Sequence, residues 1–368
     1  MSRPESLPFR ASLEDYQKRA QSLFDALKSG GEDAQWRFKW EHPRFRGRSV
    51  REVRGAELAL ADAQIVVAHE YSFETWSNLA TFAESIQQDE PVTSFETAAE
   101  AVVSGDISTL KKMLRDERPE LTTARSTRRH HATLLHYSAA NGVEGFRQKT
   151  PSNALDIAKT LLEAGAEVDA LADMYDQKCT TMSMLVSSSH PAEAGLQGRL
   201  AELLLDYGAA FLGPGSKWQS ALMTALTFGY LDTAQTLARR GAKVDNIAAA
   251  AGLGRSADVA RMLPGADSES RHQALALAAQ LGQAAVVRLL LDAGEEPNRY
   301  NPEGLHSHST PLHQAICANH LNVVKLLLER GARPDIRDTI YEGTALGWAL
   351  HCQKAEIADY LRAKGAGE

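Results

Sequence analysis

The hydrophobic positions between residues 310 and 332 follow the spacing of two short, consecutive helices. The first helix is expected to begin at Thr310 and Pro311, because a proline at the first helical position loses no hydrogen bond. The second helix is predicted to end at Gly331, where a left-handed backbone is required. Its apolar stripe consists of Val323, Val324, Leu326, Leu327 and Leu328. This segment therefore predicts a pair of packed helices joined by a turn.

The spacing within this segment recurs along the chain. Eighteen positions separate His313 from Gly331. The same interval separates Met223 from Gly241, Ala276 from Gly294, and Gly347 from Gly365. Less regular copies begin at Ala99, His136, Ser183 and Ala248. A repeated helix pair predicts an elongated array, because each unit must bury its apolar face against its neighbours.

The sequence TPLHQA at residues 310–315, followed by the apolar stripe and Gly331, resembles the ankyrin repeat. This resemblance covers roughly residues 95–366 and implies an all-α fold. The implied architecture is an ankyrin-repeat solenoid of about eight repeats over residues 91–368, preceded by a small helical domain. The expected repeat anchors are positions 99, 136, 183, 223, 248, 276, 313 and 347. In the family's pattern, the imidazole of His313 ties the first turn of its helix to a neighbouring segment.

Two repeats are longer than the family period of about 33 residues. Repeat two gains residues near 143–153 and repeat three near 190–196, in each case between its two helices. The connection after Gly241 is too short for the usual β-hairpin finger, whereas the fingers at 297–309 and 333–343 are long. Neutral drift in loops explains any single insertion equally well. Two insertions at equivalent points of neighbouring repeats favour one shared lobe on the surface.

Residues 1–90 do not follow the repeat and are predicted to form a helical N-terminal module. Amphipathic helices are expected at Leu13–Lys28 and Glu57–His69, with a third following them. The stretch ADAQIVVAHEYSFETWSNL resembles a helical module that precedes ankyrin repeats in bacterial proteins, except that Ser72 replaces its usual glycine. Its simplest role is to cap the first repeat, because an uncovered terminal repeat leaves an apolar face in water.

Composition and charge limit the expected partners. The 368 residues carry a net charge of −7, so we expect neither a nucleic acid nor a membrane surface, both of which are anionic, as a partner. No run is apolar enough to span a bilayer, and the opening residues lack the apolar core of a signal peptide. The three cysteines, Cys179, Cys317 and Cys352, are too scattered for a disulfide framework. A cytoplasmic location is therefore predicted.

One segment departs from this acidic composition. Between Trp36 and Arg54, basic residues alternate with aromatic rings, which is the composition of a platform for single-stranded nucleic acid. The alternative is that the rings belong to the core of a small domain and the arginines form its solvated edge. We favour this second interpretation, because the whole chain is acidic and no RNA-binding motif accompanies the segment.

Common catalytic motifs are absent: the sequence contains no HExxH, no GxSxG elbow, no Walker loop and no GxGxxG pattern after a strand. The spacing of the twelve histidines does not support a metal site, and no cofactor is expected. Ionisable residues beside the insertions are the candidates for acid–base chemistry, namely His190, Glu193, Asp173 and Glu144. The same residues fit a polar rim equally well, so catalysis stays an open alternative.

Recognition is the usual outcome for ankyrin arrays, so the resemblance implies binding of a protein or an extended ligand in a concave groove. The aromatic anchors expected to matter most are Tyr175, Phe228 and Tyr230. Further residues predicted to contact a ligand are Asn141, Arg147, Ser187, Thr227, Gln280 and His351. The alternative function is a small-molecule or acid–base pocket formed by the insertions of repeats two and three.

Overall fold

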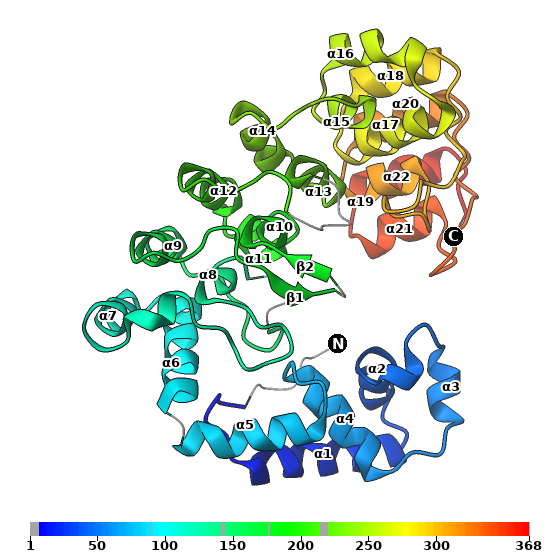
Figure 1. The fold of residues 1–368 in the computed structure, drawn as a ribbon. Coiled ribbons are helices and arrows are strands. Elements are labelled where there is room, and N and C mark those ends of the chain that lie inside the picture. Colours follow the sequence, from blue (N-terminus) through cyan, green and yellow to red (C-terminus); the bar gives the residue numbers. More distant parts are fainter. Residues whose placement is uncertain (1–6, 89, 141–143, 176, 214–219, 368) are drawn as a thin grey trace. The chain divides into compact units, whose positions relative to one another are not determined.

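The computed structural model describes residues 7–88, 90–140, 144–175, 177–213 and 220–367. The chain divides into two compact units, one ending at residue 217 and the other beginning at residue 218. Each unit consists mainly of short helices, as Figure 1 shows, and the predicted all-α class is confirmed.

The first helices of the chain form an N-terminal module with one apolar core. They are α1 (Leu13–Lys28), α2 (Glu32–Glu41), η1 (Pro43–Phe45), α3 (Val50–Arg54), α4 (Leu60–Glu70) and α5 (Trp76–Gln88). The predicted bounds of α1 are confirmed. This helix begins where it does because Ser12 Oγ accepts a hydrogen bond from the N–H of Asp15, while the Asp15 carboxylate accepts one from the N–H of Ser12.

Helix α4 begins later than the apolar pattern predicted. The expected start was Glu57, whereas the helix runs from Leu60. Asp62 Oδ2 accepts a hydrogen bond from the N–H of Ala59 at 2.8 Å. This contact satisfies a backbone donor that the helix itself cannot satisfy, and it fixes the first turn at Leu60.

The aromatic residues between Trp36 and Arg54 fall into two groups. Phe38 and Phe45 belong to the core of the module, as predicted. Trp40, by contrast, is 61% exposed, and its ring stacks on Trp36 with a centroid separation of 6.5 Å. The prediction that the rings of this segment are core residues is therefore wrong for Trp40.

Helix pairs follow the module in the first unit. Two short helical segments, η2 (Met113–Glu117) and η3 (Pro119–Thr122), lie between the first and the second of these pairs. The pairs are α6 (Glu90–Ser104) with α7 (Ile107–Lys112), α8 (Leu134–Tyr137) with α9 (Ala154–Glu163), and α10 (Thr181–Leu185) with α12 (Gln197–Asp206). Helices α7, α9 and α12 lie next to one another (Figure 1). They bury Leu110, Leu161 and Leu204.

Extra residues occur between the helices of two of these pairs. Residues 138–153 connect α8 to α9, and the short helix α11 (Ser189–Glu193) lies between α10 and α12. The two connections meet where they begin, because Ser188 Oγ donates a hydrogen bond to the carbonyl of Ala140 at 3.0 Å.

The start of α8 is tied to the finger that precedes α10. This finger is an antiparallel hairpin of β1 (Ala172–Met174) and β2 (Gln177–Cys179). His136 Nδ1 lies 2.8 Å from the Oγ1 of Thr133, and its Nε2 lies 3.3 Å from the carbonyl oxygen of Cys179. His136 therefore links the turn to the hairpin, as the repeat pattern implied.

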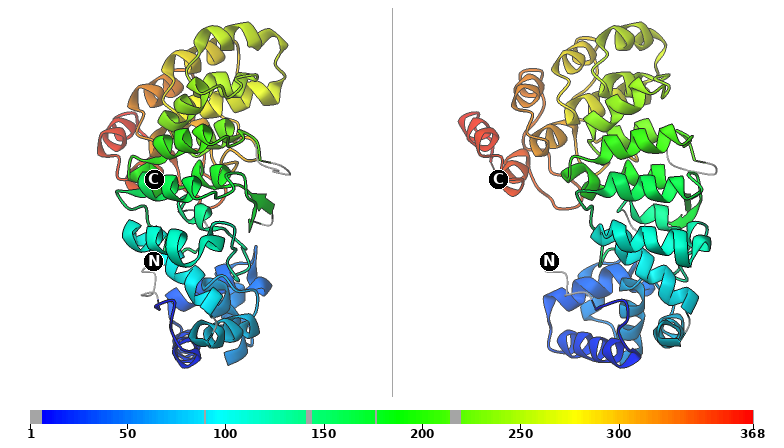
Figure 2. Two further views of the ribbon diagram at one scale, coloured as in Figure 1. Left: turned by 60° about the vertical axis from the view of Figure 1, so that its left-hand side comes forward. Right: turned by 90° about the vertical axis from the view of Figure 1, so that its left-hand side faces the viewer.

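The second unit continues with helix pairs around an alanine-rich core. The pairs are α13 (Ala221–Thr227) with α14 (Leu231–Arg239), α15 (Ile247–Gly252) with α16 (Ser256–Met262), α17 (Ser268–Gln280) with α18 (Ala284–Asp292), α19 (Pro311–Cys317) with α20 (Leu321–Glu329), and α21 (Ala345–His351) with α22 (Ala355–Ala363). A turn η4 (Leu263–Gly265) follows α16. In both views of Figure 2 the later pairs, coloured yellow to red, follow one another in sequence order. Small residues allow this close approach: a Cβ added at Gly252 would lie 3.0 Å from a methyl carbon of Leu226.

Candidate functional site

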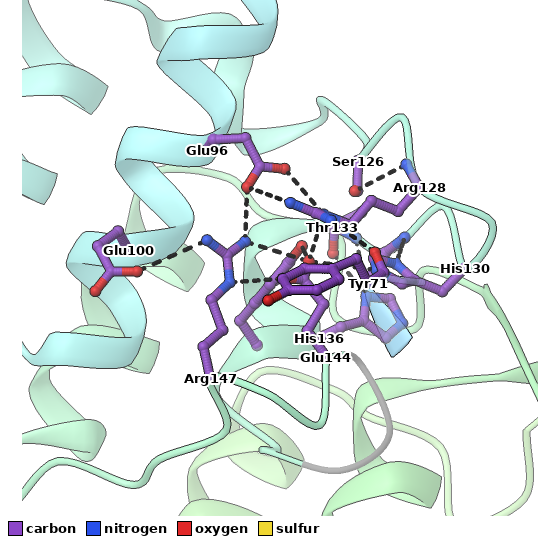
Figure 3. Close-up of polar contacts among 12 residues, drawn as sticks. Tyr71, Glu96, Glu100, Ser126, Arg128, His130, Thr133, His136, Glu144 and Arg147 are labelled. Carbon is purple, nitrogen blue, oxygen red and sulfur yellow. Dashed lines mark hydrogen bonds and ion pairs between the residues drawn. The ribbon is translucent and has the colours of Figure 1, made fainter. Parts of the chain in front are cut away.

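Charged side chains gather where the N-terminal module meets the first helix pairs. We define the buried charge cluster as Glu96, Arg128, His130, Glu144 and Arg147. Helix α6, the loop before α8 and the connection between α8 and α9 all contribute to it (Figure 3). None of the five residues is more than 8% exposed, so their charges need partners inside the protein.

Arg128 makes contacts to three parts of the chain. Its Nη1 donates a hydrogen bond to the backbone carbonyl of Tyr71 at 2.7 Å. Its Nη2 lies 3.2 Å from Glu96 Oε2, and its Nε lies 3.1 Å from Glu144 Oε1. The guanidinium also stacks over the ring of Phe73, 4.8 Å from the centroid. One side chain thus joins the module, α6 and the α8–α9 connection.

Arg147 contacts the same two carboxylates (Figure 3). Its Nη2 donates to Glu96 Oε2 at 2.9 Å, and its Nε lies 2.6 Å from Glu144 Oε2. The hydroxyl of Tyr137 donates to Glu144 Oε1 at 2.5 Å. Two guanidinium groups therefore balance two carboxylates, which is the condition under which buried charges are tolerated.

The pKa shifts in the cluster have clear physical causes. Burial alone would raise the pKa of Glu144, but Arg128 and Arg147 hold it well below its ordinary value. Burial raises the pKa of Tyr137 well above 10.0, and burial lowers the pKa of His130. At neutral pH Glu144 is therefore an ionised acceptor and His130 is neutral. This arrangement holds segments together and leaves no group poised to exchange a proton.

From sequence, Glu144 and Arg147 are expected in a polar rim or in a pocket formed by the insertions. Their side chains are instead inside the protein, because the connection between α8 and α9 folds back onto α6. Glu96 and Arg128 were not among the candidate residues. A signal for Glu96 exists in the sequence: it interrupts the apolar stripe of α6, in helical phase with Val103.

A cleft of about 820 Å³ opens beside this cluster, and we call it the module–hairpin cleft. Its volume is within the range of known ligand pockets, about 300–1,000 Å³. The module contributes Arg46, His69 and Glu74, the loop before α8 contributes Arg129 and His130, and the hairpin contributes Asp173, Tyr175, Gln177 and Lys178. The cleft therefore combines basic, acidic and aromatic side chains from separate parts of the first unit.

Asp173 and Tyr175, two of the residues singled out from the sequence, lie on the hairpin side of this cleft. The Asp173 carboxylate is already bound to the ammonium of Lys178 and lies 3.1 Å from His131 Nδ1. These contacts, the one with Lys178 above all, lower the pKa of Asp173. Tyr175 is 58% exposed, and its backbone is left-handed at φ 53°. The ring is thus presented to solvent by the tight turn of the hairpin.

The residues predicted on the second insertion lie apart from these groups. His190 and Glu193 both belong to α11, where His190 is half-buried and Glu193 is exposed. Among the residues that the structure describes, no hydrogen bond or ion pair joins either side chain to Asp173 or Glu144. The Oγ of Ser187 donates to backbone carbonyls of α10. Asn141 lies outside the described residues.

Four predicted contact residues do lie together, in the second unit. Gln280 Nε2 donates a hydrogen bond to the carbonyl of Thr227 at 2.9 Å. The rings of Phe228 and Tyr230 stack at a centroid separation of 6.4 Å with an interplanar angle of 12°. We call Thr227, Phe228, Tyr230 and Gln280 the aromatic turn. His351, the remaining predicted contact residue, is exposed at the end of α21.

Metal ligands, membrane spans and thiols are the other features relevant to a site in the described parts of the chain. They contain no group of three or more histidine, cysteine or acidic side chains that could hold a metal ion. None of the helices placed by the structure has both the length and the apolar character needed to cross a membrane. The thiols of Cys179, Cys317 and Cys352 are free.

Comparison with known proteins gives one family. The family described as "Ankyrin repeats (3 copies)" matches residues 247–338 and 278–367 of this chain. "Ankyrin repeat and SAM domain-containing protein 6" of Mus musculus is 34% identical over 103 residues, which are 28% of this chain and 11% of the relative. "Ankyrin repeat and KH domain-containing protein mask-1" of Caenorhabditis elegans is 26% identical over 219 residues, 57% of this chain and 8% of the relative. An ankyrin repeat-containing protein of Schizosaccharomyces pombe is 39% identical over 85 residues, 23% of this chain and 37% of the relative. The matched regions thus span a minor part of each relative.

Proposed function

Because this chain is an ankyrin-repeat protein, we propose that it is a recognition scaffold whose concave groove binds another protein through the aromatic turn. The observation that carries this proposal is the exposure of Phe228. Its ring is 41% exposed although it is already stacked on Tyr230. Large aromatic side chains of this kind are enriched among the residues that dominate binding free energies.

The setting of the aromatic turn supports tight binding. Helix α13, which ends at Thr227, is buried from Ala221 to Leu226. Gln280, the last residue of α17, donates a hydrogen bond to the carbonyl of Thr227. A turn that is fixed before the partner arrives loses little conformational entropy on binding, so more of the contact free energy appears as affinity.

The test compares the whole chain with a Phe228→Ala/Tyr230→Ala double variant. Proteins captured by the wild type are identified by mass spectrometry, and each is then purified and titrated by calorimetry. We expect the double variant to bind the specific partner at least about tenfold more weakly, which is about 1.4 kcal/mol.

Tyr207 offers a matched control. It is a tyrosine that is 37% exposed, and it follows α12 and does not belong to the aromatic turn. Tyr207→Ala should leave the affinity unchanged. Equal affinities for the wild type and the double variant would place the interface elsewhere and contradict the proposal.

An acid–base pocket at the insertions has less support. Glu144 is locked between two guanidinium groups, and Asp173 is bound to Lys178 and His131. A general base needs a carboxylate or imidazole within reach of a substrate proton and with a suitable pKa. The described contacts favour holding the chain together over proton transfer.

A further inference from the structure

Two arginines of the module–hairpin cleft have guanidinium groups without a direct polar partner among the described residues. Arg46 and Arg129 are both exposed and both line the cleft. Among the described residues, no carboxylate oxygen lies within 4.0 Å of either guanidinium, and neither guanidinium makes a hydrogen bond. Arg37 of the same module, by contrast, is paired with Glu70 at 2.6 Å. The cleft therefore presents two complete sets of guanidinium donors.

The acidic groups near the cleft do not neutralise these two arginines by contact. Asp173 is already bound by Lys178. Burial and the neighbouring Glu70 raise the pKa of Glu41, and the charges of Arg129 and Arg46 only partly oppose this shift. Glu74 is exposed, and its carboxylate makes no hydrogen bond among the described residues. Glu74 is thus an exposed carboxylate of the cleft lining that would repel an incoming anion.

The hairpin side of the cleft adds an acceptor and an aromatic surface. Gln177 Oε1 is buried and has no hydrogen-bond partner among the described residues. A buried acceptor without a donor is unfavourable, so a ligand N–H that reached it would be favoured. Tyr175 places a half-exposed ring beside it. Carboxylates would pair with the two arginines, and a backbone N–H would donate to Gln177 Oε1. A peptide with acidic side chains supplies both groups.

We propose that the module–hairpin cleft binds an acidic peptide segment of a partner protein, with Arg46 and Arg129 pairing its carboxylates. Arginine is suited to this role because its planar fork binds carboxylates in a bidentate manner. Gln177 accepts a backbone N–H of the segment, and Tyr175 packs against its side chains. The site belongs to the first unit and does not depend on the aromatic turn of the second.

The experiment measures binding of a fluorescein-labelled oligoglutamate peptide to the whole chain by anisotropy, at low and at physiological ionic strength. Arg46→Ala and Arg129→Ala should each weaken binding about tenfold, and the double variant should remove measurable binding. Glu74→Gln should strengthen binding about twofold, because it removes an opposing charge from the cleft. Far-UV circular dichroism should be unchanged in all variants, since neither guanidinium makes a hydrogen bond or ion pair among the described residues.

Arg51 is the matched control, because it is exposed on α3 and does not line the cleft. Arg51→Ala should change the affinity by less than about twofold. An equal loss in Arg51→Ala and Arg129→Ala would show that net charge alone attracts the probe, and would overturn the proposal. Absence of oligoglutamate binding by the wild type would also overturn it.

Two further probes separate the sources of the negative charge. Single-stranded oligothymidylate that bound more tightly than oligoglutamate and was lost in the same variants would assign the site to nucleic acid and overturn the proposal. Free glutarate that competed with the peptide at equal affinity would assign the cleft to a small dicarboxylate and would also overturn the proposal. Phe228→Ala/Tyr230→Ala should bind oligoglutamate like the wild type, so failure at one site is distinguishable from failure at the other.

Discussion

The two compact units use the same kind of helix pair but bury different chemistry around it. The first unit encloses two guanidinium groups and two carboxylates in the buried charge cluster. The second unit packs apolar inner helices such as α15, which is buried from Ile247 to Gly252. One buried carboxylate of this unit, Asp338, is held by N–H donors, among them the indole of Trp348 at 2.9 Å. The repeat pattern therefore constrains the local turn and leaves the surrounding core free to differ.

The turn itself is the same in both units. The Oγ1 of Thr133 lies 2.8 Å from His136 Nδ1 in the first unit, and the Oγ1 of Thr310 lies 2.8 Å from His313 Nδ1 in the second. These two repeats therefore share the turn and differ in what surrounds it. Variants that act on one unit and leave the other unchanged can test this comparison.

The largest effect is expected from Glu144→Gln in the first unit. The substitution keeps the shape of the side chain but leaves Arg128 and Arg147 with one carboxylate fewer. Breaking a buried ion pair by removing one partner costs about 3–5 kcal/mol. We expect hydrogen exchange followed by mass spectrometry to show faster exchange in the first unit and unchanged protection in the second.

Glu100 provides the control for this variant. Its side chain is 44% exposed and lies 3.7 Å from Arg147 Nη1. Glu100→Gln should lower the free energy of unfolding by less than about 1 kcal/mol, since surface ion pairs contribute little. Equal losses for the two variants would mean that burial does not distinguish the two glutamates.

The next effect is a difference in pH dependence between one residue of each unit, His136 and Asp338. Burial lowers the pKa of His136 from 6.5 to about 4. The unfolded chain therefore binds a proton on this histidine before the folded chain does, and stability is lost as the pH falls from 6.5 to about 4. The shift corresponds to about 3 kcal/mol, so the stability advantage of the wild type over His136→Gln should shrink by that amount across this window.

Asp338 in the second unit responds at lower pH. Burial alone would raise its pKa, but hydrogen bonds from Trp348 and from the backbone N–H groups of Tyr341, Gly343 and Ile340 lower it from 3.8 to about 2. The stability that it contributes, about 2 kcal/mol, is present above pH 3.8 and is lost as the pH falls to about 2. Urea titrations of Asp338→Asn at a series of pH values check this. A shared window for the two variants would contradict the comparison.

The smallest effect is expected for the second insertion. Glu193 is exposed and His190 is half-buried on α11. Glu193→Ala and His190→Ala should each change the free energy of unfolding by less than about 0.5 kcal/mol, as is usual for such surface positions. Thermal unfolding and the oligoglutamate assay are measured on the same samples. A loss above about 1 kcal/mol would assign these residues a structural role through buried hydrogen bonds.

Much of the fold follows from the sequence because the repeat pattern is local. The spacing from His313 to Gly331, the cap at Ser12 and the apolar stripe of α1 all depend on neighbours within a few turns. The start of α4 was placed too early, because Ala59 and Asp62 fix it through a contact that the apolar pattern does not contain.

The sites were harder to predict, since they depend on contacts between distant segments. The aromatic turn could be approached from sequence, because Phe228 and Tyr230 flank one glycine within a single repeat. The buried charge cluster could not, because Arg128 reaches back to Tyr71 and Glu96 across segments of irregular length. Hydrophobic periodicity indicates which residues face the core, but it does not indicate which charged side chains contact one another there.

The contact between Arg128 and the Tyr71 carbonyl also affects the order of events during synthesis. Arg128 follows Tyr71 by 57 residues. At about 5–20 residues per second, the ribosome needs about 3–11 s to add them. Throughout this interval the nascent N-terminal module lacks the side chain that binds the carbonyl at the end of α4, so a chaperone has time to engage it. Slower translation of residues 71–128 would lengthen this exposure.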